Sequence, residues 1–193
     1  MNDAWFFGYG SLVNRATHAH DQAHPALLTG WRRVWRHTTL RPIAFLTVIP
    51  DPDAEIDGLI AAVPGADWTH LDDRERAYDR VSVPDVRHGT GPVGDIHLYT
   101  IPDGKHGRPD RLHPVLLSYI DVVVEGYLNE FGTDGVDRFF ATTDGWDAPI
   151  ADDRKKPRYP RHRNVPATVQ RMIDVRLSDR GADVIGPEPL RNP

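Results

Sequence analysis

The sequence predicts an α+β fold in which a small mixed β-sheet or barrel is flanked by helices. Two observations lead to this prediction. The first hundred residues contain several short apolar segments bounded by turn residues, and a longer segment with helical apolar spacing follows them. The chain has 193 residues, which is enough for one domain with its own core. We therefore expect a single domain over residues 1–193, with a loose, proline-rich C-terminal tail at 181–193.

Short strands account for most of the first half of the predicted fold. The aromatic-rich segment 5–9 is interpreted as a buried strand that runs into a tight loop at Gly10 and Ser11. A turn at 50–53, which contains two prolines, is expected to separate two of the later strands. The remaining strands are predicted at 27–35, 43–49, 56–63, 78–83 and 93–101.

Two segments have clear helical patterns. Residues 67–77 are predicted to form a short helix with Asp67 as its N-cap. The strongest helix is expected at 114–131, where apolar residues recur at helical spacing and Gly132 is a natural end.

The pattern after Gly132 is weaker. Residues 133–143 are compatible with a second short helix, and the polar segment 144–164 is predicted to be a long loop. The segment 168–177 alternates between apolar and polar residues and is predicted to be a late strand.

Composition narrows the classes of function. The chain has no cysteine, which excludes disulfide frameworks, thiolate zinc sites and cysteine nucleophiles. The net charge is −5 and basic residues are spread along the chain, so neither a nucleic-acid nor a membrane partner is expected. No segment approaches the ~20 apolar residues that span a bilayer, and the apolar run 4–7 is too short for a signal peptide. We expect a cytoplasmic protein, and nothing in the sequence indicates its oligomeric state.

The first candidate site is the loop Gly-Tyr-Gly-Ser-Leu at 8–12, directly after the first predicted strand. Glycines allow a sharp turn and a close approach of the backbone to a ligand. Exposed N–H groups in such a turn can hold a carboxylate or an oxyanion. The same pentapeptide is also compatible with an ordinary turn at the end of a strand.

The second candidate is the charged segment 71–81, in which Glu75 lies near the end of the predicted helix. The C-terminus of a helix disfavours a negative charge, which would raise the pKa of Glu75 toward the range of a general acid/base. Neighbouring arginines would oppose this effect. Asp72 and Asp73 remain alternatives, because the pattern alone does not say which carboxylate faces inward.

Together the two segments resemble the gamma-glutamylcyclotransferase-like superfamily. Its members carry a Tyr-Gly-Ser loop after the first strand, which matches 9–12, and a catalytic Glu some tens of residues later, which matches Glu75 in Leu-Asp-Asp-Arg-Glu. The stretch Gly-Trp-Arg-Arg-Val-Trp at 30–35 is similar to the Gly-x-Arg-Arg strand of the ChaC-type branch, and Arg-Glu followed by Tyr78 is similar to a further motif of that branch. The resemblance covers residues 5–101, whereas 126–146 and 154–163 match no motif of the family.

The resemblance implies an enzyme that cyclises a gamma-glutamyl peptide or amine to 5-oxoproline and releases the amine, without metal or cofactor. Glu75 takes the position of the general acid/base. The positions of the substrate pocket fall on Tyr9, Gly10, Ser11 and Leu12. The family also places a tyrosine from the later helix in the pocket. Tyr119 or Tyr127 can serve here, although Tyr127 lies on the apolar stripe of the helix, which favours packing.

The implied substrate is a small gamma-glutamyl molecule. The ChaC-like stretch suggests glutathione, and gamma-glutamyl amino acids and amines remain open. The main alternative function is a module on the same fold that binds a small molecule or a partner without turnover.

Two further sequence features suggest other ligands. His18, His20 and His24 invite a metal hypothesis, because the spacing of the last two would place them on one face of a helix, but no third ligand follows at typical spacing. The basic segment 154–163 is compatible with a phosphate or nucleic-acid patch. It contains a single aromatic residue, Tyr159, so a solvated loop is the favoured interpretation.

Overall fold

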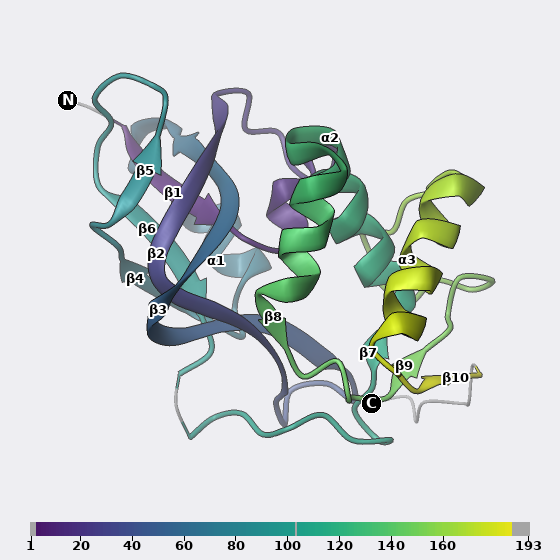
Figure 1. Cartoon of the computed structure of the whole chain (residues 1–193). Helices are drawn as coiled ribbons and strands as arrows, with labels where there is room; N and C mark the ends of the chain where they lie inside the picture. Colours follow the sequence, from purple (N-terminus) through teal and green to yellow (C-terminus); the bar gives the residue numbers. More distant parts are fainter. Residues whose placement is uncertain (1–2, 103, 187–193) are drawn as a thin grey trace.

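A mixed sheet forms one layer of the molecule and helices form the other (Figure 1). The computed structural model describes residues 3–102 and 104–186. Strand order in the main sheet is β4-β6-β1-β3-β2-β5, with β8 paired to β2. Among the described residues the edge strands β4 and β5 do not pair with each other, so the sheet is open rather than a closed barrel. The α+β prediction of a mixed sheet with flanking helices is confirmed in its open-sheet form.

The strands of this sheet differ widely in length. They are β1 (Ala4–Gly8), β2 (Ala23–His37), β3 (Ala44–Val63), β4 (Asp79–Ser82), β5 (Val86–His88), β6 (Ile96–Thr100) and β8 (Thr143–Asp144). β1 lies inside the sheet, antiparallel to β3 and parallel to β6. A short second sheet contains β7 (Val115–Leu116), β9 (Ile150–Ala151) and β10 (Val184–Ile185).

The predicted turn at 50–53 is wrong, because one strand, β3, runs through it. β3 pairs with β2 on both sides of an irregularity, with Thr29 opposite Glu55 and Trp31 opposite Pro50. Residues 51–54 therefore bulge out opposite Gly30, and the prolines fall where the ladder of hydrogen bonds is already interrupted. The turn residues do break the ladder, but within one long strand rather than between two.

In the described part of the chain, three longer helices and three short 3-10 turns complete the fold. They are η1 (Ser11–Val13), η2 (Arg15–Thr17), η3 (Pro64–Ala66), α1 (Thr69–Arg74), α2 (Leu117–Ala141) and α3 (Ala167–Asp179). α1 is shorter than predicted, and its N-cap is Trp68 rather than Asp67. The carboxylate of Asp67 still accepts a hydrogen bond from the backbone N–H of Thr69.

Gly132 divides α2 as the sequence predicts. Its φ of 67° and ψ of −167° are not helical, and the chain is helical on both sides of it. This backbone conformation is essentially restricted to glycine. The predicted helix end at 132 and the second helix after it are therefore confirmed.

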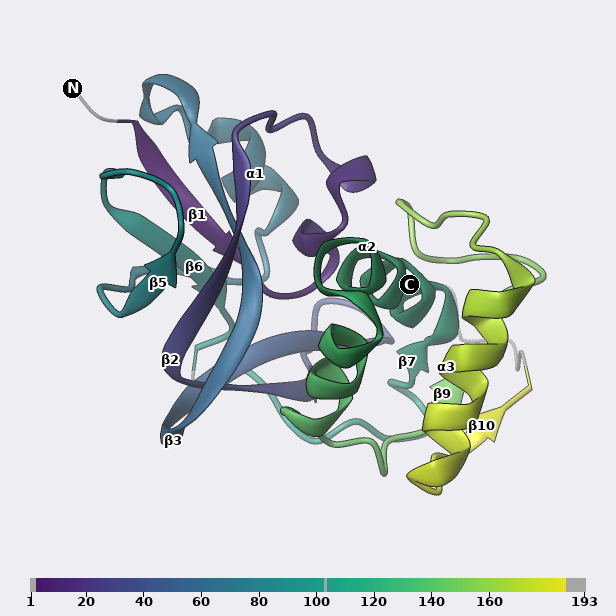
Figure 2. The ribbon, with the colours of Figure 1, turned by 45° about the horizontal axis from the view of Figure 1, so that its top comes forward.

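The predicted strand at 168–177 is wrong, because this segment lies in the helix α3. Val169, Ile173 and Leu177 are its buried residues and recur every fourth position, which is helical spacing. The local alternation of apolar and polar residues concealed this longer period. α3 packs on the side of α2 that faces away from the sheet (Figure 2).

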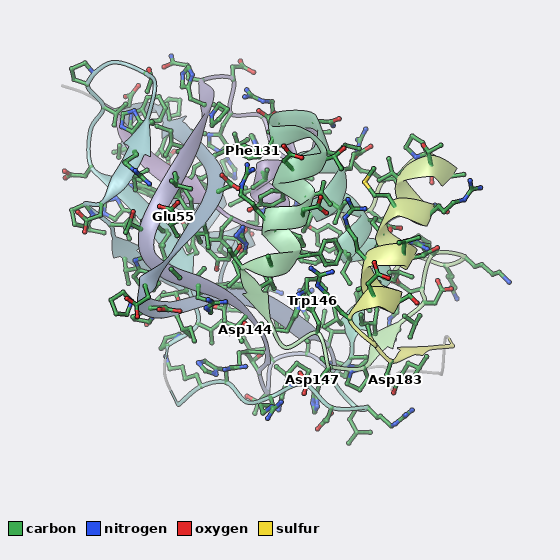
Figure 3. All side chains as sticks on the ribbon, in the orientation of Figure 1. Glu55, Phe131, Asp144, Trp146, Asp147 and Asp183 are labelled. Carbon is green, nitrogen blue, oxygen red and sulfur yellow. The ribbon has the colours of Figure 1, made fainter. Side chains whose placement is uncertain are left out.

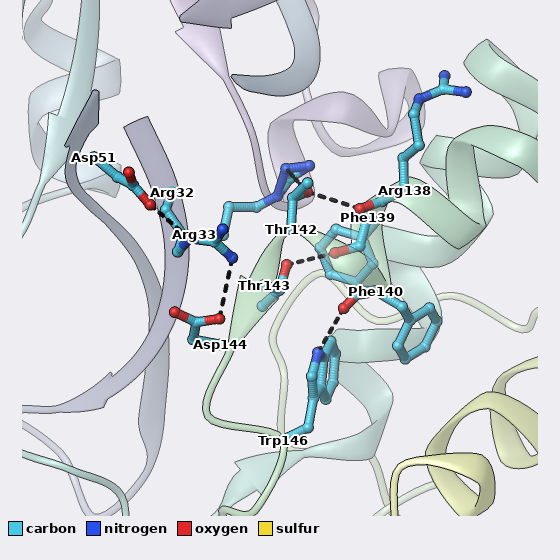
Figure 4. Close-up of polar contacts among 10 residues, drawn as sticks. All are labelled: Arg32, Arg33, Asp51, Arg138, Phe139, Phe140, Thr142, Thr143, Asp144 and Trp146. Carbon is cyan, nitrogen blue, oxygen red and sulfur yellow. Dashed lines mark hydrogen bonds and ion pairs between the residues drawn. The ribbon is translucent and has the colours of Figure 1, made fainter. Parts of the chain in front are cut away.

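The segment after α2 is tied to both layers (Figure 4). Arg32 of β2 donates to Asp51 and Asp144, and the indole N–H of Trp146 donates to the carbonyl of Phe140 at 3.1 Å. Trp146, labelled in Figure 3, also stacks on the ring of Phe140 with a centroid distance of 4.7 Å. These contacts close the end of the core between β2 and α2.

The C-terminal tail begins with a paired strand. β10 pairs in parallel with β9, so the part of the predicted loose tail at Val184–Ile185 is ordered by the second sheet. Residues 187–193 lie outside the described residues. No helix in the described part of the chain is long and apolar enough to cross a membrane.

Candidate active site

The loop that follows β1 is held in place by α2. The side-chain amide of Asn14 donates to the carbonyl of Val122 at 2.9 Å. The hydroxyl of Tyr127 lies 2.9 Å from the carbonyl oxygen of Tyr9 and 2.7 Å from that of Asp57. Tyr127 is fully buried, so this tyrosine supports the loop from within the core and does not line an open pocket.

Gly10 permits a close approach between this loop and Tyr119. A Cβ atom at position 10 would lie 2.6 Å from the hydroxyl oxygen of Tyr119, which is too short for a non-bonded contact. Only glycine therefore fits here without displacement of the tyrosine. The contact brings a hydroxyl from the first turn of α2 directly to the predicted substrate loop.

Glu75 is the C-cap residue of α1 and directly follows its last residue, Arg74. Its carboxylate pairs with the Arg74 guanidinium at 2.8 Å, and its side chain is 17% exposed. The same guanidinium donates to the carbonyl of Thr17 at 2.9 Å and to the hydroxyl of Ser11 at 3.1 Å. Arg74 thus fixes Glu75 relative to the loop after β1, although some 60 residues of sequence separate them.

Opposing influences set the proton affinity of Glu75. Burial raises the pKa of this carboxyl above its usual value, because an ionised carboxylate loses solvation. Arg74, by charge and hydrogen bond, and Arg161, by charge, act in the opposite direction. The helix end was the predicted cause of a raised pKa, whereas the structure assigns the shift to burial first. A carboxyl with a raised pKa can both accept and return a proton near neutral pH.

The predicted residues meet at two hollows that share lining residues and are called inner and outer below. The inner one, of about 30 Å³, is lined by Tyr9, Gly10, Ser11 and Leu12 together with Glu75 and Tyr119. The outer cavity, of about 530 Å³, shares Ser11, Glu75 and Tyr119 with it. That outer volume lies within the usual range for small-molecule sites. The structure therefore brings every predicted site residue together.

The two alternative carboxylates are placed differently. Asp72 accepts a hydrogen bond from the hydroxyl of Tyr99 at 2.6 Å and pairs with Arg80, and it lines neither hollow. Asp73 lines the outer cavity but is exposed and does not reach the inner hollow. Glu75 is the carboxylate common to both hollows.

Two further tyrosines line the outer cavity and were not among the predicted site residues. The hydroxyl of Tyr78 donates to the carbonyl of Leu46 at 2.9 Å. Tyr159 meets Tyr119 edge to face, with ring centroids 4.9 Å apart. Burial raises the pKa of Tyr78 and of Tyr119, and the neighbouring tyrosines and Glu75 raise both further, so these hydroxyls remain protonated donors. The sequence pointed to Tyr78 through its place after the Arg-Glu motif. Tyr159 was notable only as the single aromatic residue in a basic segment.

The histidines singled out in the sequence do not form the expected helical pair. His20 lies in a coil before β2 and hydrogen-bonds the carbonyl of Ala62, whereas His24 lies within β2. His18 hydrogen-bonds the carbonyl of Leu12 instead. The helix-face spacing on which the metal hypothesis depended is therefore absent.

A different group of side chains has the composition of a metal site. The potential ligand atoms of His37, Asp110 and His113 lie within 4.8 Å of one another. One carboxylate oxygen of Asp110 already accepts hydrogen bonds from the backbone N–H of Leu112 and of His113 and contacts the ring of His113. These hydrogen bonds stabilise a turn, which explains why the three side chains lie together. The cluster shares no residue with the lining of the two hollows that contain Glu75.

The basic segment 154–163 is not a continuous cationic surface. Arg154 pairs with Asp121 and Asp174, and Arg163 pairs with Glu125. Arg158 and Arg161 line the outer cavity instead. The segment forms one wall of the candidate active site.

Comparison with known proteins identifies the family of the chain. The family model described as ChaC-like protein matches residues 4–108, which is 105 of the 193 residues. No curated protein matches the sequence at a significant level.

Several solved structures share the fold at low sequence identity. YkqA from Bacillus subtilis matches with a TM-score of 0.58 and 17% identity over 72% of this chain, and this chain spans 53% of that protein. An uncharacterized human protein matches with a TM-score of 0.57 and 14% identity, over 90% of this chain and 99% of its own. A structure named gamma-glutamyl cyclotransferase matches with a TM-score of 0.56 and 15% identity over the same shares. The ChaC-type resemblance found in the sequence is thus confirmed: the chain belongs to the ChaC-like family and shares its fold with a structure named gamma-glutamyl cyclotransferase.

Proposed function

We propose that this protein is a gamma-glutamylcyclotransferase, which converts a gamma-glutamyl peptide or amine to 5-oxoproline and releases the amine. The observation that carries the proposal is the position of Glu75. It is the carboxylate shared by the inner hollow, formed by the loop after β1, and by the larger outer cavity. Membership of the ChaC-like family and the fold shared with a named gamma-glutamyl cyclotransferase support the same activity.

The reaction places one proton-transfer group under two demands. The α-ammonium of the glutamyl group must lose a proton before its nitrogen attacks the γ-carbonyl carbon, and Glu75 accepts that proton. The new C–N bond closes the five-membered ring, and the original amide C–N bond breaks. The leaving nitrogen takes this proton from Glu75, the attacking nitrogen loses its second proton as it becomes the lactam N–H, and that second proton ends on the released amine. Atoms and charge therefore balance without water. The raised pKa of Glu75 suits a group that must serve as base and then as acid.

The substrate has to be folded so that its own amine reaches its own carbonyl. The loop at 9–12 is rigidly held by Tyr127 and Arg74, and Tyr119 closes on Gly10 from the other side. In the proposal these groups bind the glutamyl part and hold it bent. Such orientation of reacting groups can contribute up to ~7–11 kcal/mol to catalysis.

The experiment that tests the proposal identifies both product and oxygen source. Purified protein is incubated with glutathione, a gamma-glutamyl amino acid and a gamma-glutamyl amine in ¹⁸O-labelled water, and the products are identified by mass spectrometry. We expect 5-oxoproline that carries no ¹⁸O from at least one substrate, because no water attacks. Glutamate labelled with ¹⁸O would show hydrolysis instead. A folded protein that binds these compounds without releasing any product would be the non-catalytic binding module.

A further inference from the structure

Four arginines line the outer cavity without a carboxylate partner among the described residues. They are Arg41, Arg76, Arg158 and Arg161. The other charged groups lining this cavity are the Arg74–Glu75 pair and the exposed Asp73. The cavity therefore has an excess of positive charge that no carboxylate among the described residues neutralises, although the chain as a whole carries a net charge of −5.

The contrast with neighbouring arginines shows that this excess is local. Arg154 pairs with Asp121 at 2.7 Å, and Arg163 pairs with Glu125 at 2.9 Å. Both lie on the same segment as Arg158 and Arg161, and both are neutralised on the side that faces the helices. The two arginines left without a carboxylate are the two that line the cavity.

Residues 158–161 form a wall of the outer cavity, and a buried carboxylate holds this wall in position. Asp153 is 4% exposed and accepts hydrogen bonds from the hydroxyl of Ser118 at 2.6 Å and from the backbone N–H of Arg158 at 2.8 Å. Its second oxygen accepts from the backbone N–H of Ser118 at 2.8 Å. The backbone at Arg158 is thus fixed to the start of α2, one residue before Tyr119.

The wall also stands close to the proposed reaction centre. Tyr159 packs edge to face against Tyr119, and the charge of Arg161 lowers the proton affinity of Glu75. If the glutamyl group occupies the loop at 9–12, the part of the substrate beyond the amide bond enters the outer cavity. Arg158, which is half-buried, and Arg161, which is exposed, face that part.

We propose that Arg158 and Arg161 form an anion subsite that binds a carboxylate on the leaving group. This inference rests on the proposed cyclotransferase function and narrows its substrate class to gamma-glutamyl amino acids and peptides, in preference to gamma-glutamyl amines. A guanidinium matches a carboxylate with two parallel hydrogen bonds and stays charged at all relevant pH values. Both residues lie outside the segment 4–108 that matches the family model, so this chain's own C-terminal segment sets the preference.

The test compares two ligands that differ only in that carboxylate: gamma-glutamyl-alanine and gamma-glutamyl-alaninamide. We expect the wild-type kcat/KM for the acid to exceed that for the amide by about 10- to 100-fold, which is the usual worth of a charge-assisted hydrogen bond. The double variant Arg158→Gln/Arg161→Gln should bring this ratio close to one. Because the subsite is partly exposed, the wild-type ratio should also shrink as ionic strength rises.

A matched control removes a positive charge elsewhere. Arg171 is exposed on α3 and does not line the cavity, so Arg171→Gln should keep the wild-type ratio. Equal kcat/KM values for acid and amide in an active wild-type enzyme would overturn the subsite and leave the cyclotransferase function intact.

Binding to the non-reacting Glu75→Gln variant separates the subsite from the chemistry. Calorimetric titration of that variant with the same two ligands should give the same preference for the acid, and the added Arg158→Gln/Arg161→Gln changes should remove it. If neither ligand turns over with wild-type protein but the preference in binding persists, the proposed reaction fails and the anion subsite stands. Equal affinities for the acid and the amide would overturn the subsite.

Discussion

Tyr119 and Tyr127 lie about two helical turns apart on α2, and their hydroxyls approach the loop after β1 in different ways. The Tyr127 hydroxyl lies within hydrogen-bond distance of two buried carbonyls, and the Tyr119 hydroxyl lies against Gly10 at the inner hollow. Two residues of the same type on one helix are therefore expected to differ in what they support. We expect Tyr127 to contribute to stability and Tyr119 to substrate binding.

Replacing each tyrosine by phenylalanine tests this division. Tyr127→Phe leaves the carbonyls without their hydroxyl partner, at a cost of about 1–3 kcal/mol. The melting temperature should fall by about 2–4 °C for each kcal/mol. Tyr119→Phe should leave the melting temperature nearly unchanged and lower kcat/KM by about 2- to 12-fold, the worth of one hydrogen bond. Thermal unfolding and initial rates measure both effects. The opposite pattern, with Tyr119→Phe the less stable variant and Tyr127→Phe the less active one, would contradict the division.

The environment of Glu75 leads to a prediction on pH dependence. Glu75 must be ionised to accept the first proton, so kcat/KM should be present above its pKa and lost as the pH falls through it. Burial raises that pKa and the charge of Arg161 lowers it. Arg161→Gln should therefore move the acid limb of the pH profile to higher pH.

The profile is best measured with a substrate that has no carboxylate on its leaving group, so that the binding role proposed for Arg161 does not interfere. Arg171→Gln serves again as the control for charge loss, and its acid limb should coincide with that of the wild type. A shift of the Arg161→Gln limb to lower pH would mean that another group titrates.

At the scale of elements, the segment between β9 and α3 owes its path to one side chain. Asp153 accepts three hydrogen bonds, from the hydroxyl and backbone N–H of Ser118 and from the backbone N–H of Arg158. Asparagine has the same shape, but its NH₂ group cannot accept a hydrogen bond. At least one of these donors would then face another donor.

Asp153→Asn should therefore destabilise the protein by about 1–3 kcal/mol. It should also weaken the preference for an anionic leaving group, because Arg158 loses its anchor. Thermal unfolding measures the first effect, and the ratio of kcat/KM for the gamma-glutamyl-alanine acid and amide measures the second. Asp152→Asn, in the neighbouring residue, is the comparison. Asp152 accepts one local bond from the backbone N–H of Arg154, so its loss should have a smaller effect. If Asp153→Asn had wild-type stability, the anchoring role would be disproved.

The elements also show where sequence patterns are sufficient. α2 and its interruption at Gly132 could be predicted, because a long apolar stripe and a glycine act locally. The continuous strand β3 could not be predicted, because only pairing with β2 shows that Pro50 lies at the edge of a bulge and Pro52 within it. α3 was missed because its three buried residues are spaced over nine positions while neighbouring residues alternate.

At the scale of the whole molecule, the candidate site combines three segments that are far apart in the sequence. The loop at 9–12, the end of α1 at Glu75 and the wall at 158–161 all border the outer cavity, together with Tyr119 from α2. The first two could be identified from sequence because they carry family motifs. The wall could not be identified from the sequence. Only the structure shows which arginines of this segment are paired with carboxylates of the helices and which are not.

The central claim is that Glu75 performs the proton transfers in this cavity. The most direct measurement is the rate of 5-oxoproline release by wild type and by Glu75→Gln, on the substrate that the wild type turns over fastest. Circular dichroism and thermal unfolding of both proteins establish that the variant is folded. The account predicts a folded variant whose rate falls by about 10²- to 10⁴-fold, which is the typical contribution of a general acid/base. A folded Glu75→Gln variant that releases 5-oxoproline at close to the wild-type rate would contradict it.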